Sequence, residues 1–180
     1  EENATGLDTY GKLDRQIIQL CNKNRIIDII HNFIIFDAGI KKTCRHNQYF
    51  GVKAAQKRIA ENKGGVIWHT QGSGKSLTMV WLAKWILEHD SDARVLVITD
   101  RTELDDQIKL VFNGVDEDIW QAPSSRRLFE ELNITDKRLL CSLVHKFGRV
   151  SNTNGNPEYH IDINEIRKTL PSNFLPKGKI

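Results

Sequence analysis

Apolar residues recur every three or four positions along several segments of the chain, and this spacing predicts amphipathic helices. The pattern is clear around Leu77, Val80 and Trp81, which share one helical face. The helices that we expect lie at residues 13–36, with a break at 22–24, and at 48–62, 76–89, 102–112 and 126–132. Thr102 is the expected N-cap of its helix, because a threonine hydroxyl accepts hydrogen bonds from free amides at that position.

Other segments are apolar at almost every position, which is typical of strands buried on both faces of a parallel sheet. These segments are residues 66–68, 95–98 and 139–144. Turn-forming residues predict a helix stop at 37–39 and surface loops at 113–125 and 151–157. Strands that alternate with amphipathic helices indicate an α/β fold, with a parallel sheet covered on both faces.

The segment 69–76 joins an expected strand to an expected helix and reads His-Thr-Gln-Gly-Ser-Gly-Lys-Ser. Gly72 and Gly74 permit backbone conformations in which several amides converge on one anion. The N-terminus of the following helix adds its dipole. Lys75 can reach the β- and γ-phosphates, and the Ser76 hydroxyl is placed to bind Mg²⁺. We interpret this segment as a phosphate-binding loop (P-loop) for ATP, rather than a chance Gly/Ser-rich turn.

Two further features have both a functional and an ordinary explanation. The Gln48 amide can donate to and accept from the edge of adenine, although a polar residue at a helix start is common. The run at 95–107 places Thr99, Arg101 and Thr102 where a strand meets a helix. Such a position suits a nucleic-acid phosphate, but it is equally consistent with a capped helix and a solvated arginine.

Composition narrows the class of protein only a little. The chain has 180 residues, 39% of them hydrophobic, which is enough for one domain with a core. Its net charge of +3 permits nucleic-acid binding without arguing for it. Its 3 cysteines contain no CxxC pair, which disfavours a disulfide framework or zinc site and favours a reducing cytoplasm. No apolar run approaches the roughly 18 residues of a membrane span.

At these motifs the chain resembles the motor region of the restriction (R) subunit of type I restriction-modification enzymes, in superfamily 2 of the helicases. The resemblance rests on Gln48 and on the runs at 65–76 and 95–107, and it extends more weakly to 140–147. It covers about residues 13–148, which is most of the chain.

The resemblance implies a partial RecA-like P-loop domain at 45–180, preceded at 1–44 by a helical linker that follows a nuclease domain. It implies ATP and Mg²⁺ as cofactors, double-stranded DNA as the track for translocation and cleavage, and specificity and methyltransferase subunits as partners. Lys75 becomes the candidate catalytic residue, Ser76 the metal ligand, and Thr99, Arg101 and Thr102 the DNA contacts. The candidate nucleotide-binding residues are Arg45, Gln48, Thr70, Gln71, Gly72, Ser73, Gly74, Lys75, Ser76 and Leu77.

A helicase-type ATPase also needs an Asp-Glu pair after a later strand and an arginine from a second RecA-like domain. The pair Asp116-Glu117 follows no apolar strand, and we set it aside. We therefore expect a fragment of a larger protein that does not turn over ATP by itself. Two alternatives stay open: another superfamily 2 helicase or chromatin-remodeller-like translocase, and a stand-alone small-molecule kinase.

Overall fold

A three-stranded parallel sheet forms the centre of the computed structural model, in the order β3 (Val95–Thr99), β5 (Leu139–Leu143), β4 (Trp120–Gln121). Val95 pairs with Leu139, and the register continues to Thr99 opposite Leu143. The α/β class and the parallel sheet are thus confirmed. The structure describes residues 11, 14, 17–18, 21–37, 39–134, 136–147, 149–153 and 156–160.

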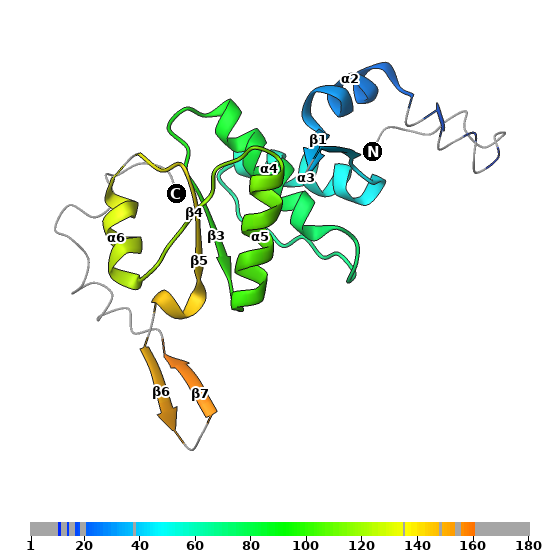
Figure 1. Cartoon of the computed structure of the whole chain (residues 1–180). Helices are drawn as coiled ribbons and strands as arrows, with labels where there is room; N and C mark the ends of the chain where they lie inside the picture. The colour runs from blue at the N-terminus through cyan, green and yellow to red at the C-terminus, as the bar shows by residue number, and fades with distance from the viewer. Residues whose placement is uncertain are drawn as a thin grey trace.

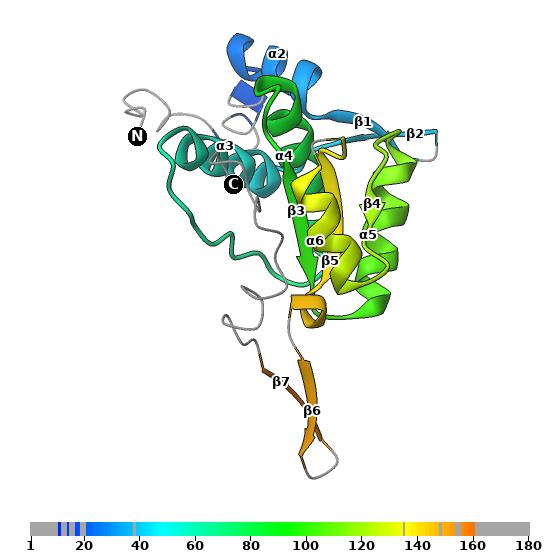
Figure 2. The same cartoon turned by 90° about the vertical axis from the view of Figure 1, so that its left-hand side faces the viewer.

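Helices cover both faces of this sheet. Helices α4 (Lys75–His89) and α5 (Thr102–Gly114) lie on one face, and α6 (Ser125–Asn133) lies on the other (Figures 1 and 2). Every residue of β5 is buried, as expected for a strand between two layers. Helix α5 begins where predicted, but its N-cap is the extended residue Arg101, so the expected capping role of Thr102 is wrong.

Helices α2 (Lys23–Asn32) and α3 (His46–Ala60) complete the helical part. The expected break at 22–24 is confirmed, because the Asn22 side chain caps α2. Helix α3 packs against α4, and Val52 and Trp81 share one hydrophobic core. Among the described residues, no helix is both long enough and apolar enough to cross a membrane. Most of the helix expected at 13–20 lies outside the described residues.

The segment expected to be helical up to residue 36 ends in a strand instead. Strand β1 (Ile34–Asp37) pairs antiparallel with β2 (Ile40–Thr43), so the expected helix stop is a hairpin turn. Successive side chains of a strand point to opposite faces, and Ile35 is accordingly 4% exposed and Phe36 57%. The apolar run at 33–36 fits both periods, and pairing with β2 favours the strand.

The strand expected at 66–68 does not form. Val66 and Trp68 are 87% and 90% exposed, and the backbone there is irregular. A strand requires a neighbour for its amides and carbonyls. Within the described part of the chain, the segment 66–68 pairs with no strand.

Three further strands lie at least partly where loops were expected. Strand β4 falls inside the segment 113–125, where only two residues pair. Beyond β5 and the short 3-10 helix η2 (Val144–Phe147), strands β6 (Arg149–Thr153) and β7 (Asn156–His160) form an antiparallel ribbon. This ribbon extends away from the sheet (Figure 2). Backbone pairing, rather than an apolar pattern, makes it a ribbon.

Candidate nucleotide-binding site

The backbone of the P-loop adopts conformations that only glycine takes easily. Gly72 and Gly74 have φ values of 74° and 81°, in the left-handed region. Gly74 is also the N-cap of α4, and no side chain caps that helix. The first amides of α4 therefore remain available to an anion, as they are at other anion-binding helix starts.

Ser73 supplies a second sign that a ligand belongs here. Its side chain is 9% exposed, and its hydroxyl has no hydrogen-bond partner in the part of the chain that the structure describes. Leaving a buried hydroxyl unpaired costs about 1–3 kcal/mol. A phosphate oxygen accepts such a hydrogen bond, so this loop fits the phosphates of a nucleotide.

Lys75 lies on the exposed side of the same loop. Its Nζ donates to the carbonyl oxygens of Thr70 (3.0 Å) and His69 (3.5 Å). Carbonyls do not neutralise the ammonium, so its charge remains available to a phosphate. Ser76 is half-buried. The described residues contain no group of three or more His, Cys, Asp or Glu side chains that could hold a metal ion.

Gln48 connects α3 to the P-loop. The side chain is 2% exposed, its Oε1 accepts from the Arg45 amide (2.7 Å), and its Nε2 donates to the carbonyl of Gly74 (2.9 Å). Arg45 reaches the loop as well, since its Nη1 lies 3.4 Å from the carbonyl of Gly72. The structure thus brings both residues to the loop, and Gln48 holds the loop in place.

An open cavity of about 530 Å³ lies beside the loop, and it is lined by Arg45, Asn47, Trp68, His69, Thr70, Gln71, Gly72 and Ser73. Asn47 and Trp68 were not predicted. His69 is the first residue of the segment 69–76, and it was not among the candidate nucleotide-binding residues. Its ring packs over Gly51 of α3, where an added Cβ would lie 3.2 Å from Cε1. Among the predicted residues, Leu77 instead packs against the core.

The pair Asp116-Glu117 has a structural role. Asp116 occupies a left-handed turn with φ 61°, and Glu117 forms an ion pair with Lys84 of α4 at 2.8 Å. The turn follows α5 directly. These contacts explain both acidic residues without a bound metal, in agreement with the sequence interpretation.

The loop after β3 separates the candidate DNA contacts into two kinds. Thr99 is 8% exposed, and its hydroxyl donates to Asp105 at 3.3 Å. Arg101 and Thr102 are exposed, and Arg101 has a 3.6 Å contact with the equally exposed Asp100. In the described ranges, no hydrogen bond or ion pair joins this loop to the P-loop. Thr99 can therefore act on a ligand only through the shape of the loop.

Asp105 is the centre of a buried polar cluster that sequence reasoning missed. It is 1% exposed, and it accepts hydrogen bonds from Thr99, from Gln121 and from the Cys141 thiol (2.6 Å). Burial and the neighbouring Asp105 carboxylate raise the pKa of Cys141 to about 12. The thiol therefore stays protonated near neutral pH and remains a donor. The cluster ties β3, β4 and β5 to the first turn of α5.

Comparisons with known proteins identify a matching family and several similar proteins. The sequence profile of the SWI2/SNF2 ATPase family matches residues 47–170. The MjaIXP type I restriction enzyme endonuclease subunit of Methanocaldococcus jannaschii is 32% identical over 154 residues, covering 79% of this chain and 15% of that protein. The type I restriction enzyme HindI endonuclease subunit of Haemophilus influenzae is 33% identical over 112 residues, covering 54% of this chain and 11% of that protein. The chain therefore matches only 11–15% of the length of these relatives. The predicted resemblance to R subunits is confirmed.

Proposed function

Because the chain belongs to the SWI2/SNF2 ATPase family, we propose that its P-loop binds Mg²⁺·ATP and is the nucleotide-binding site of a DNA motor. The observation that carries this proposal is the uncapped start of α4 beside the unpaired Ser73 hydroxyl. Lys75 would stabilise the β- and γ-phosphates, and Ser76 would hold the metal. Arg45, which lines the cavity, would contact the base. The amide of Gln48, expected to read adenine, is buried and is bonded to Arg45 and Gly74, so its proposed role is to support Arg45 and the loop.

The test is the affinity of the 180-residue chain for Mg²⁺·ATP, measured by calorimetry. Replacing Lys75 with alanine should weaken binding by a factor of about 10 to 100, because a charge-assisted contact contributes about 1.5–3 kcal/mol. Lys109→Ala is the matched control, since Lys109 is an exposed lysine on α5, and it should leave the affinity unchanged. Equal affinities for Lys75→Ala and the parent chain would refute the proposal that the P-loop binds ATP.

The whole protein to which this chain corresponds would be the endonuclease (R) subunit of a type I restriction enzyme. The named relatives support this proposal. On this view ATP hydrolysis drives translocation along double-stranded DNA and leads to cleavage, in a complex with specificity and methyltransferase subunits in the cytoplasm. Residues 1–44 would be the linker after a nuclease domain, and the 180-residue chain alone would not turn over ATP. The match to the SWI2/SNF2 family is also consistent with one alternative to a restriction subunit, a remodeller-like DNA translocase.

For DNA, the proposed contacts are Arg101 and Thr102, with Thr99 shaping their loop. Arg101→Ala should weaken binding of duplex DNA by a similar factor for any sequence. It should also lower the slope of log affinity against log salt by about one, since one phosphate contact is lost. Fluorescence anisotropy at several salt concentrations measures both quantities. Arg126→Ala, at an exposed arginine of α6, is the control. An unchanged slope for Arg101→Ala would exclude this contact.

A further inference from the structure

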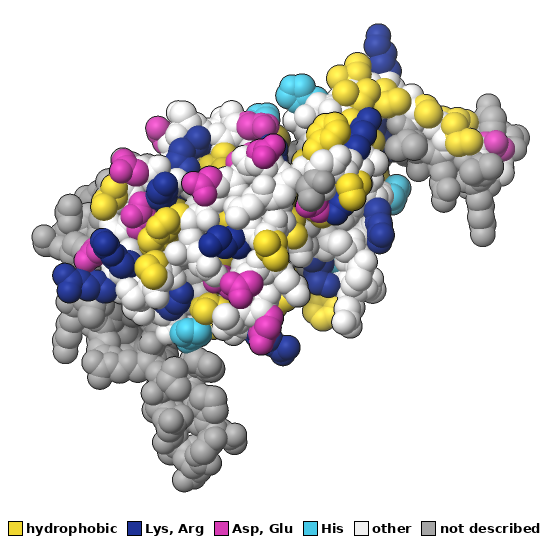
Figure 3. All heavy atoms as spheres, in the orientation of Figure 1, with side chains coloured by type: hydrophobic (Ala, Val, Ile, Leu, Met, Phe, Trp, Pro, Cys, Tyr) yellow, Lys and Arg dark blue, Asp and Glu magenta, His cyan; other side chains and the backbone are white. Residues whose placement is uncertain are grey.

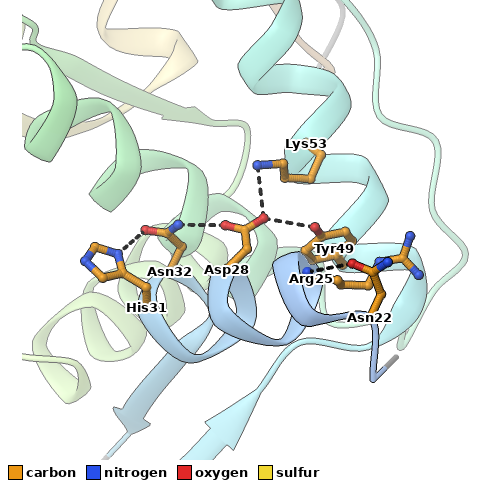
Figure 4. A network of polar contacts seen from close by, with 7 residues as sticks. All are labelled: Asn22, Arg25, Asp28, His31, Asn32, Tyr49 and Lys53. Carbon is orange, nitrogen blue, oxygen red and sulfur yellow. Dashed lines mark hydrogen bonds and ion pairs between the residues drawn. The ribbon is translucent and has the colours of Figure 1, made fainter. Parts of the chain in front are cut away.

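The carboxylate of Asp28 joins helix α2 to helix α3 (Figure 4). One oxygen accepts from the Tyr49 hydroxyl at 2.9 Å and forms an ion pair with Lys53 at 3.0 Å. The other oxygen accepts from Asn32 at 2.7 Å, within α2 itself. Asp28 therefore has three donor partners, and two of them belong to α3.

The protonation of this cluster favours the arrangement. Burial alone would raise the pKa of Asp28, but hydrogen bonds from Asn32, Lys53 and Tyr49 outweigh it and hold the pKa below its usual value. Burial and the Asp28 carboxylate raise the pKa of Tyr49. Near neutral pH the pair is thus a charged acceptor and a neutral donor.

Aromatic contacts extend the cluster towards the P-loop helix. The Arg25 guanidinium lies 5.6 Å from the centre of the Tyr49 ring. The ring of Phe33, at the end of α2, lies 5.0 Å from Tyr49 and 6.0 Å from Trp81 of α4. Phe33 and Trp81 are both completely or almost completely buried, so these rings have little room to move.

The residue before Tyr49 is Gln48, which donates to the carbonyl of Gly74 at 2.9 Å. Two routes therefore lead from α2 to α4, one to the N-cap of the helix and one to its middle. One passes through Asp28, Tyr49 and the backbone of α3 to Gln48, and the other passes through Phe33 to Trp81. Both reach the helix whose first residue is Lys75.

We propose that Asp28 is a positioning residue for nucleotide binding. Its hydrogen bond with Tyr49 and its ion pair with Lys53 fix the position of α3, and α3 in turn positions Gln48 to donate to the carbonyl of Gly74. The inference rests on the proposed function of the P-loop. Coupling of this kind is reciprocal: a change that moves α2 alters nucleotide affinity, and bound nucleotide strengthens the docking of α2.

The experiment measures the affinity of the 180-residue chain for Mg²⁺·ATP well below its melting temperature. Asp28→Ala should weaken binding about fivefold or more. Asp28→Asn keeps an acceptor for Tyr49 without the charge for Lys53, and it should recover part of the loss. Leu128→Ala is the control for general destabilisation, since Leu128 is fully buried in α6 on the other face of the sheet. It should lower the melting temperature and leave the affinity unchanged.

A second measurement does not depend on nucleotide. Hydrogen exchange at the amides of 74–78 should speed up in Asp28→Ala without ligand, and not in Leu128→Ala. If the parent chain binds no ATP, the proposed function fails, and exchange still decides whether Asp28 positions the loop. If the parent binds ATP but Asp28→Ala matches it in affinity and in exchange, the positioning role alone is overturned.

Discussion

Replacing Gly74 with alanine should reduce the affinity for Mg²⁺·ATP by about 100-fold, equivalent to about 2.7 kcal/mol. Two costs add at this position. With φ at 81°, any side chain strains the backbone by about 1–3 kcal/mol. An added Cβ would also collide with Nε2 of Gln48, and because this side chain is only 2% exposed, it could move only by losing its present contacts. The hydrogen bond from Gln48 to the Gly74 carbonyl would break, and the amides at the start of α4 would no longer converge.

Two other glycines separate these costs. Gly72 and Gly39 have φ values of 74° and 80°, and an added Cβ at either meets no atom within 4 Å. Gly39→Ala, in the β1–β2 turn, should reduce stability without changing affinity. Gly72→Ala should weaken binding by strain alone, and therefore less than Gly74→Ala. If calorimetry gave Gly74→Ala and Gly39→Ala the same affinity, the contact with Gln48 would be irrelevant to binding.

Replacing Asp105 with alanine should lower the free energy of unfolding by about 3 kcal/mol or more. The change removes the common acceptor of Thr99, Gln121 and Cys141. It leaves the buried donors of Thr99 and Cys141 without partners, and it leaves the half-buried Gln121 with only a long contact to Asp106. Each unpaired buried donor costs about 1–3 kcal/mol. Urea unfolding followed by circular dichroism measures the loss.

The neighbouring Asp106 is the matched control for this change. It is an exposed acidic residue with one long contact to Gln121, at 3.4 Å. Asp106→Ala should stay within about 0.5 kcal/mol of the parent, as expected for a surface position. Similar urea midpoints for both variants would show that the cluster does not stabilise the sheet.

The parts of the fold that could be predicted are those whose pattern and neighbours agree. The runs at 95–98 and 139–144 are apolar except at Ser142, and they pair with each other as β3 and β5. The run at 66–68 has the same pattern, but no strand beside it in the described residues, so Val66 and Trp68 are exposed. The hydrophobic pattern of a segment shows only its preference for the strand conformation. Whether a strand forms depends on which other segment lies beside it.

The candidate site shows a similar division. Gly72, Gly74 and Lys75 follow from a local motif whose backbone geometry is set by the loop itself. Of the cavity residues that were not predicted, Trp68 directly precedes the loop, and Asn47 belongs to α3, which reaches the loop only because α3 packs against α4. Asp105 reads as a helix-start carboxylate in sequence. Its burial depends on contacts with β4 and β5, which lie far along the chain.

The exposed segment at 66–68 has a consequence for the behaviour of the chain in solution. Strand β3 has a partner on one side only among the described strands, and its Ile98 side chain is 52% exposed. An unpaired edge with apolar side chains beside it is a template for association between molecules. At high concentration this edge is therefore where aggregation of the chain would begin, and charged residues introduced there would improve its solubility.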